Sequence, residues 1–400
     1  MNIDQYQILV NKKLYFNKDS RVLLLQGPIG NFFDEFSKFI SKKSGIVFKI
    51  NFTIAEAFFY KQDNNFFFRD SIDNWPVYFL NFVKENNINR VYFLNDSRPY
   101  HSSIIDICMK NQIDFYVFED GYFRPGYITL EPQGVNGNSF FRKFSSQHDS
   151  LDKINNCPKL CLELKGKLLS RVLFSLIYNF NFLFSKNYIS YRPGNSLYWS
   201  KKYIFSFIIF AFNFIKDKVL LKKTLNSNDK ILFIPLQVFD DTQIKYHSKY
   251  NDIYEFIDDI FYTLSLLIKS DYRIIFKQHP GDRGNINYNK YINELAKRNG
   301  LSKQIIFNYT TDANQLINFS DGIILINSTL GINALTLGKK VFTAGISTYD
   351  SVCTQDNLDI FINDILDESP MKNKKTDLDN FFVKLKKATQ VKGSFYKSYD

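Results

Sequence analysis

Two adjacent carboxylates, Glu119 and Asp120, stand where an apolar run ends in the segment VFEDGYFRPG (117–126). The run 114–118 is typical of a strand, and a glycine follows the two acids at once. A carboxylate at a strand end can act as a general base or as a nucleophile. Because adjacent strand residues point to opposite faces, only one acid is expected to reach a reacting atom. We predict Asp120 in that role and Glu119 as its supporting group.

Two further strand ends in the first half of the chain carry polar or flexible residues. In QGPIGNFF (26–33), Gly27 and Gly30 permit a tight turn and a close approach to a ligand. The turn lacks the Lys-Ser/Thr of a P-loop and the spacing of a dinucleotide fingerprint, so a plain strand-to-helix turn is the alternative. In NDSRPYH (95–101), Arg98 and His101 are expected to project toward the same edge as the two acids, or else simply to be solvated.

The second half has two strand ends that suit a phosphate group. His279 in FKQHPGDRG (276–284) is one of only four histidines and lies near Lys277, which suits phosphate contact or proton donation. In INSTLG (326–331), the hydroxyls of Ser328 and Thr329 stand where a helix is expected to begin. An N-cap would explain Ser328 alone, whereas two hydroxyls and a following glycine also make a phosphate cradle without a metal.

The elements that would position these residues alternate between strand and helix in both halves of the chain. In the first half we predict strands at 21–26, 46–52, 90–96 and 114–120, and helices at 31–43, 74–88 and 100–111. In the second half we predict strands at 230–237, 272–280, 304–309, 321–328 and 339–345, and helices at 253–269, 288–300, 312–320 and 329–338. Apolar strands separated by helices predict parallel sheets that are covered on both faces. The expected fold is α/β, with two Rossmann-like domains facing a central cleft.

The segment between the two halves has a different composition. Residues 168–186 and 201–218 are rich in Phe and are flanked by Lys and Arg, and the uninterrupted apolar run 203–212 is too short to span a membrane. These residues are either core helices that join the domains or interfacial helices with Lys201, Lys202, Lys216 and Lys218 at lipid headgroups. We therefore expect an N-terminal domain at 1–150, a basic aromatic helical connector at 151–229 with a potential membrane contact, and a C-terminal domain at 230–400.

Length and composition set limits on the class of protein. With 400 residues, 42 Phe and 25 Tyr, the chain is long and apolar enough for two folded domains. The formal net charge of +11 favours anionic partners. The first twenty residues lack the features of a secretory signal, so we expect a cytoplasmic protein. The four cysteines (Cys108, Cys157, Cys161 and Cys353) are too scattered for a disulfide framework, and we expect reduced thiols and no metal.

Several motifs together resemble one known family. In chain order they are LLLQGPIGNFF, DSRPYH, FEDGYFRPGYITLEPQGVNGNS, IPLQVFDDTQI, FKQHPGDRG and INSTLGINALTLGKKVFTAGISTYD. This set resembles the KpsS/LipB-type capsule polysaccharide synthesis proteins, which are Kdo transferases of Gram-negative capsule assembly. The likeness runs from about residue 21 to the closing TQVKGSFYK and is weakest in the Phe-rich middle segment.

The resemblance implies a GT-B-like fold and the transfer of β-linked Kdo from CMP-Kdo to a phosphatidylglycerol-type lipid, which begins the linker of the capsule chain. It makes Asp120 the catalytic carboxylate, with Glu119 and His279 as further catalytic groups. Because CMP-Kdo is itself β-configured, a β product means net retention, and Asp120 could then be a nucleophile. The implied donor-binding residues are Lys277, His279, Pro280, Asn327, Ser328, Thr329 and Gly331. The implied acceptor- or sugar-binding residues are Gln26, Gly27, Gly30, Arg98, His101, Arg124, Asn136 and Gln237.

The expected partners are the CMP-sugar, an anionic phospholipid acceptor, the inner-membrane surface, a companion Kdo-extending transferase and the capsule export machinery. No cofactor is expected, and the protein would be peripheral on the cytoplasmic face of the inner membrane. One alternative is another CMP- or CDP-linked transferase, such as a sialyl- or glycerophosphotransferase. Another is a non-catalytic protein of capsule export or attachment. Nucleic acid is not an expected partner, because the basic residues are spread over two α/β domains instead of forming a stripe.

Overall fold

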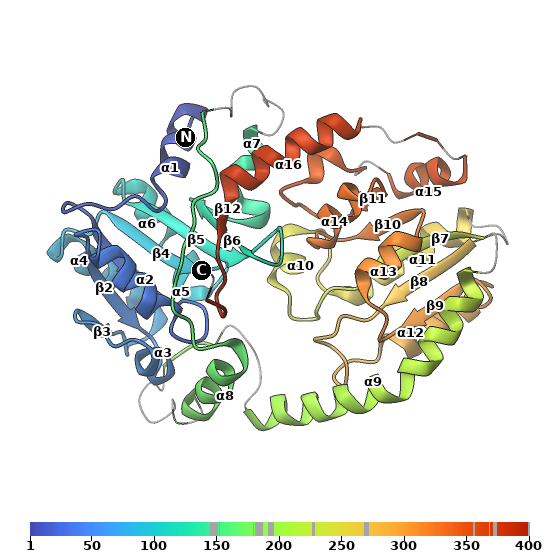
Figure 1. Cartoon of the computed structure of the whole chain (residues 1–400). Coiled ribbons are helices and arrows are strands. Elements are labelled where there is room, and N and C mark those ends of the chain that lie inside the picture. The colour runs from blue at the N-terminus through green and yellow to red at the C-terminus, as the bar shows by residue number, and fades with distance from the viewer. Residues whose placement is uncertain are drawn as a thin grey trace. The chain divides into compact units, whose positions relative to one another are not determined.

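The chain forms two α/β units (Figure 1). The computed structural model describes residues 1–144, 151, 153–178, 180, 187–190, 196–225, 229–267, 272–354, 357–367, 369–370 and 374–398. Unit 1 comprises Met1–Ser196 and Phe381–Asp400, and unit 2 comprises Leu197–Asn380.

Unit 1 is built on a seven-stranded sheet with the order β12-β6-β5-β4-β1-β2-β3. Its strands are β1 (Arg21–Leu24), β2 (Ile46–Asn51), β3 (Asn65–Phe67), β4 (Arg90–Leu94), β5 (Asp114–Asp120), β6 (Tyr127–Pro132) and β12 (Gln390–Lys392). The first five are parallel and have the order 3-2-1-4-5, which is that of a Rossmann fold. β6 and β12 extend the sheet in antiparallel fashion beyond β5.

Helices cover both faces of this sheet because its strands are apolar on both sides. One core contains Trp75 and Phe79 against Leu23 and Val117, and the other contains Phe32 against Leu24. The helices of unit 1 are α1 (Ile3–Lys12), α2 (Phe32–Ser41), α3 (Ile54–Phe59), α4 (Trp75–Glu85), α5 (Pro99–Ser102), α6 (Ile105–Lys110), α7 (Phe141–Phe144) and α8 (Lys167–Tyr178).

Unit 2 has a five-stranded parallel sheet with the order β11-β10-β7-β8-β9. The strands are β7 (Lys230–Pro235), β8 (Tyr272–Lys277), β9 (Ile305–Asn308), β10 (Gly322–Leu325) and β11 (Lys340–Thr343). When the strands of unit 2 are numbered 1 to 5 from β7 to β11 and the sheet is read from β9, the order is again 3-2-1-4-5. The same Rossmann-like topology therefore occurs twice. The helices are α9 (Ser196–Leu225), α10 (Thr242–His247), α11 (Ile253–Leu267), α12 (Tyr288–Arg298), α13 (Ala313–Phe319), α14 (Leu330–Thr336), α15 (Leu358–Leu366) and α16 (Lys375–Thr389), which crosses into unit 1.

The predicted α/β fold with two Rossmann-like domains in one chain is confirmed by these two strand orders. The bounds of the units differ from the expected 1–150, 151–229 and 230–400. The chain end returns to unit 1 because β12 pairs with β6, Gln390 lying opposite Thr129. The expected connector is divided: α8 belongs to unit 1, and nearly all of α9 belongs to unit 2.

One buried side chain of helix α9, Asp217, hydrogen-bonds to the loop between β9 and α13 of unit 2. Asp217, 2% exposed, accepts hydrogen bonds from the backbone N–H groups of Tyr309 and Thr310 at 2.9 and 2.8 Å. It also accepts one from the Thr310 hydroxyl at 2.8 Å. Among the described residues, no helix combines the length and apolar character that a membrane crossing requires.

Candidate functional site

The topology of each unit indicates where a ligand would bind. In an open parallel sheet, ligands bind beyond the carboxyl ends of the strands, where the strand order reverses. In unit 1 this point lies between β1 and β4, and in unit 2 it lies between β7 and β10. The loops after these four strands contain eight of the residues that the sequence singles out: Gln26, Gly27, Gly30, Arg98, Gln237, Asn327, Ser328 and Thr329.

A pocket of unit 1 lies at this point. Its volume is about 40 Å³, enough for a small polar group but not for a whole sugar. Its lining combines the turn after β1 with residues of α2, β2, α3, the β4–α5 loop, α8 and the segment after α8. The lining residues are Gln26, Gly27, Pro28, Ile29, Gly30, Phe33, Asp34, Lys49, Glu56, Phe59, Tyr60, Arg98, Phe174 and Tyr188. Four predicted residues, Gln26, Gly27, Gly30 and Arg98, are thus brought together.

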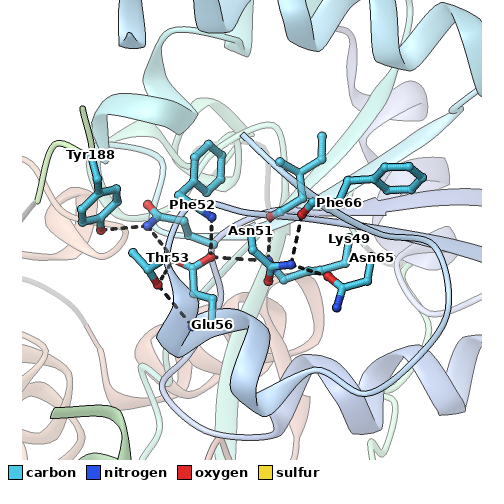
Figure 2. A network of polar contacts seen from close by, with 10 residues as sticks. Lys49, Asn51, Phe52, Thr53, Glu56, Asn65, Phe66 and Tyr188 are labelled. Atoms are coloured by element: carbon cyan, nitrogen blue, oxygen red, sulfur yellow. Dashed lines mark hydrogen bonds and ion pairs between the residues drawn. The ribbon is translucent and has the colours of Figure 1, made fainter. Parts of the chain in front are cut away.

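The polar wall of this pocket is a hydrogen-bond network centred on Glu56 (Figure 2). The Glu56 carboxylate accepts from the Gln26 side-chain amide at 3.1 Å and from the Thr53 hydroxyl at 3.2 Å. Lys49 Nζ forms an ion pair with Glu56 Oε2 at 3.5 Å. The same Gln26 Nε2 donates to the Tyr188 hydroxyl at 3.0 Å. The side chains are therefore held in fixed orientations before any ligand binds.

The pocket carries two buried cations. Lys49 is 2% exposed and Arg98 is 7% exposed. Burial lowers the pKa of Lys49 to about 8, against the opposing effect of Glu56. A guanidinium, an ammonium and a side-chain amide at one pocket are donors that suit carboxylate or hydroxyl oxygens.

The two adjacent acids at the end of β5 have different environments. Glu119 is partly buried, and it accepts from Asn95 Nδ2 and from the backbone N–H of Asp120, both at 2.9 Å. Burial raises the pKa of Glu119 to about 7, and the charge of Asp120 makes the second-largest contribution to this rise. The charge of Arg98, a residue of the pocket lining, opposes this rise in the pKa of Glu119. The side chain of Asp120 is 62% exposed and lies 3.4 Å from the guanidinium of Arg124.

Gly121 is required by the turn that follows the two acids. A Cβ at this position would lie 2.0 Å from the carbonyl oxygen of Tyr127. The hairpin between β5 and β6 therefore closes only with glycine directly after Asp120. The position of the exposed carboxylate is set by the sheet and by this close backbone contact.

Other polar residues of the same motif form a buried hydrogen-bond network. The Glu131 carboxylate accepts from the hydroxyls of Tyr122, at 2.8 Å, and Ser139. The Tyr122 hydroxyl in turn accepts from the backbone N–H of Asn136 at 2.8 Å. Burial raises the pKa of Glu131 to about 8. Asn136, predicted to bind acceptor or sugar, thus takes part through its backbone in a structural network, and it does not line the pocket.

His101 also lies away from the predicted position. It is fully buried, its Nδ1 lies 2.8 Å from the carbonyl oxygen of Asn95, and its ring lies 4.5 Å from that of Phe93. Burial, and next the charge of Arg98, lower its pKa well below the ordinary value. His101 is therefore a neutral residue of the core and has no access to a ligand in this structure.

In unit 2, Gln237 and Asn327 join the loops that follow β7 and β10. Gln237 Nε2 donates to Asn327 Oδ1 at 3.0 Å, and the backbone N–H of Asn327 donates to Gln237 Oε1 at 3.1 Å. The Asn327 amide also donates to the carbonyls of Gln243 and His247. These contacts make the pair a positioning element for the two loops.

The loop after β8 presents His279 at the surface. The backbone N–H of Gly281 donates to His279 Nδ1 at 3.0 Å, so the neutral ring carries its proton on Nε2. Pro280 follows in an exposed position. The buried Asp282 holds the loop by accepting from the backbone N–H of Phe239 at 2.9 Å. A backbone N–H thus orients the ring, and Asp282 holds the loop that carries it.

Two cations accompany His279. Lys277 is 6% exposed, and burial, and next the charge of Arg283, lower its pKa to about 8. The Arg283 guanidinium lies 5.2 Å from the centre of the Phe210 ring on α9. The loop after β8 is therefore a locally basic part of unit 2, which suits an anionic group.

The turn after β10 differs in part from its expected role. Ser328 Oγ accepts from the backbone N–H of Leu330 at 3.3 Å, and Thr329 is the residue before α14. A Cβ at Gly331 would lie 2.5 Å from the Tyr349 hydroxyl. Glycine is therefore needed here for packing against Tyr349, and this space is not open to a ligand.

The sequence-based reasoning missed Lys49, Glu56 and Tyr188. Two signals were available: Lys49 interrupts the otherwise apolar strand IVFKINF, which implies a buried partner, and Thr53 and Glu56 match the S/T-x-x-E pattern of a helix start. Nothing in the sequence around Tyr188 indicates its contact with Gln26.

The cysteines are free thiols, as expected. Within the part of the chain that the structure describes, no three His, Cys, Asp or Glu residues lie together in a way that could hold a metal ion.

Comparison with known proteins identifies the family. Residues 89–396 match the family model "Capsule polysaccharide biosynthesis protein". The chain is 28% identical over 390 residues to the capsule polysaccharide modification protein LipB of Neisseria meningitidis serogroup A, covering 94% of this chain and 91% of the relative. It is 25% identical to the capsule polysaccharide export protein KpsS of Escherichia coli, covering 82% and 86%. A solved structure of Thermosulfurimonas dismutans KpsC, a beta Kdo 2,7 transferase, aligns over 91% of this chain and 89% of that chain with 14% identity and a TM-score of 0.46. The family model covers well over half of the sequence, and the chain belongs to the capsule polysaccharide biosynthesis protein family.

Proposed function

We propose that this protein is a glycosyltransferase that moves β-linked Kdo from CMP-Kdo to a phosphatidylglycerol-type lipid and so begins the capsule linker. The observation that carries the proposal is the pair of carboxylates at the end of β5: Asp120 is exposed, and Glu119 interacts electrostatically with Arg98 of the preorganised pocket. Membership of the capsule family and the two Rossmann-like units support it. We infer no cofactor, because the nucleotide is itself the leaving group.

In the proposed reaction, Asp120 is the nucleophile because its carboxylate is the accessible one of the pair. One of its oxygens forms a bond to the anomeric carbon of Kdo while the bond from that carbon to the CMP phosphate breaks. The lipid hydroxyl then attacks the same carbon, releases its proton to water and displaces Asp120 as a free carboxylate. Two inversions give net retention. Glu119, when ionised, places a second negative charge near the positively charged transition state.

Unit 2 would receive the nucleotide. His279 Nε2–H, together with Lys277 and the hydroxyls of Ser328 and Thr329, would bind the phosphate of CMP and stabilise its charge as it departs. The unit 1 pocket would hold a carboxylate or hydroxyl of the sugar or of the acceptor through Arg98 and Gln26. In this proposal the protein acts at the cytoplasmic face of the inner membrane, where its lipid acceptor lies.

The test is to incubate the purified chain with CMP-Kdo, generated in place, and a fluorescent phosphatidylglycerol analogue, followed by mass analysis of the lipid. A mass gain of one Kdo that Asp120→Ala abolishes is the expected result. Glu294→Ala, which removes an exposed acid on α12, is the matched control and should retain transfer. Absence of any gain with folded wild-type protein would refute the Kdo assignment, and transfer from a different CMP- or CDP-linked donor would redirect it.

A second candidate function is a non-catalytic role in capsule export, because the E. coli relative is named an export protein. A binding protein should retain its capsule function in cells that carry Asp120→Ala, whereas a transferase should lose it. Complementation of a strain lacking the gene therefore separates the two functions.

A further inference from the structure

Helix α9 has two apolar faces, and the contacts of unit 2 account for only one of them. The inner face carries Asp217 and Leu221, which are 2% and 8% exposed. Phe210 on the same face lies under Arg283. These contacts fix how the helix is rotated about its axis.

The opposite face carries an exposed apolar row, which we call the outer stripe: Phe205, Ile208, Phe212, Ile215 and Val219. Successive members are alternately three and four residues apart, so they lie along one side of the helix. Their exposure ranges from 40% at Ile208 to 81% at Phe212. Five large apolar side chains in one exposed row exceed the scattered apolar residues of an ordinary surface and indicate an interaction site.

Charge decides what the stripe binds. Lys216, Lys218 and Lys222 are exposed beside it. The sequence of α9 contains six lysines and one acid, and that acid, Asp217, is buried against unit 2. A second copy of the helix packed on the stripe would therefore place lysine beside lysine along the seam, with no exposed acid to pair with. An anionic lipid surface matches both the apolar row and its basic margins.

We propose that the outer stripe of α9 docks on an anionic membrane surface, with Phe212, Ile215 and Val219 among the acyl chains and the lysines at the headgroups. The helix lies in the interface and does not cross the bilayer, in keeping with the observation that no described helix is suited to spanning. This inference deepens the proposed function, since it names the surface by which the enzyme would reach a lipid acceptor.

The test measures binding of the full chain to vesicles of phosphatidylcholine alone and of phosphatidylcholine mixed with phosphatidylglycerol, without any sugar donor. The Phe212→Ser/Ile215→Ser variant should bind the mixed vesicles roughly 100-fold more weakly, given the apolar area that two such side chains bury. Both side chains point away from unit 2, so the variant should fold normally, as circular dichroism can verify.

The matched control is Tyr262→Ser/Leu266→Ser on α11, where the two side chains are 70% and 68% exposed. This variant should bind as wild type does. Lys216→Gln/Lys218→Gln/Lys222→Gln should lose most of the preference for phosphatidylglycerol, at least tenfold, because each lysine near an anionic surface contributes about 1 kcal/mol.

Equal binding by wild type and by the stripe variant would overturn the proposal. So would a wild-type dimer in sedimentation that the stripe variant dissociates, because a second copy would then occupy the stripe. Transfer to a short-chain, water-soluble acceptor is measured in parallel. If that transfer is retained in the stripe variant while vesicle binding is lost, the proposed activity and the docking surface are established separately.

Discussion

The contact between Asp217 and the β9–α13 loop gives a prediction that depends on the structure alone. Asp217→Ala removes an acceptor that receives three hydrogen bonds of 2.8 to 2.9 Å from Tyr309 and Thr310. A hydrogen bond to a charged group contributes about 1.5–3 kcal/mol to stability. Removal of the carboxylate leaves the backbone N–H groups of Tyr309 and Thr310 without this acceptor. The substitution also removes the free energy needed to bury the charge, which offsets part of this loss.

We expect a net loss of about 3 kcal/mol in the stability of the contact between α9 and unit 2. At 1.4 kcal/mol for each factor of ten, this corresponds to amide hydrogen exchange roughly 100-fold faster in peptides covering residues 205–222 and 305–311. Hydrogen exchange with mass spectrometry suits this question, since it reports local opening of one helix in a chain of two units.

Glu294→Ala is the matched control, because Glu294 is an exposed acid on α12 of the same unit. It should leave exchange in both peptides within about twofold of wild type. Asp217→Asn, which keeps one acceptor oxygen, should give an intermediate rate. If Asp217→Ala changes exchange in α9 by less than about threefold, Asp217 does not hold the helix on unit 2 and the reasoning fails.

Three further predictions concern unit 1. With a Glu119 pKa of about 7, transfer activity should rise with pH between 6 and 8 as Glu119 ionises beside the reaction centre. Glu119→Gln should flatten this rise in kcat/KM. A rise that persists in the variant would exclude Glu119 as its source. Gly121→Ala should destabilise unit 1 by at least about 2 kcal/mol, seen as a lower Tm, because its Cβ would overlap the Tyr127 carbonyl; an unchanged Tm would contradict the tight hairpin. The folded-state pKa of Glu131 is raised from 4.5 to about 8, so the folded protein holds this proton more tightly than the unfolded chain, and stability should fall as pH rises from about 4.5 to 8. Glu131→Gln should reduce that fall, and Tm curves that run parallel from pH 5 to 8.5 would rule out Glu131 as its cause.

Local patterns in the sequence were sufficient for the parallel strands and most of the helices of both units. The strands of the parallel cores are short apolar runs between helical patterns, and burial on both faces makes such runs recognisable without tertiary information. The helices that were not predicted are α1, α3, α7, α10, α15 and α16. The strands that were not predicted are β3, β6 and β12. They lie at or beyond the edges of the parallel core of unit 1, and β6 and β12 are antiparallel, so pairing with distant residues determines them.

Only part of the candidate site could be predicted from the sequence. Polar residues at strand ends, such as Gln26 and Arg98, could be placed near a common edge because parallel strands end on the same side of a sheet. Their orientation could not be inferred, because it depends on contacts across long stretches of chain, such as that between Gln26 and Tyr188. The same holds for His101, which looked like a ligand at a strand end and lies in the core.

The sequence by itself determined the two α/β units, the basic charge, the family motifs and the adjacent acids Glu119 and Asp120. Only the tertiary structure decided which acid is exposed and which has a raised pKa, because burial depends on segments that meet through folding. It also decided which face of α9 packs against unit 2. That helix carries apolar residues on more than one side, and a contact with a loop some ninety residues away, made by Asp217, determines which apolar row remains exposed.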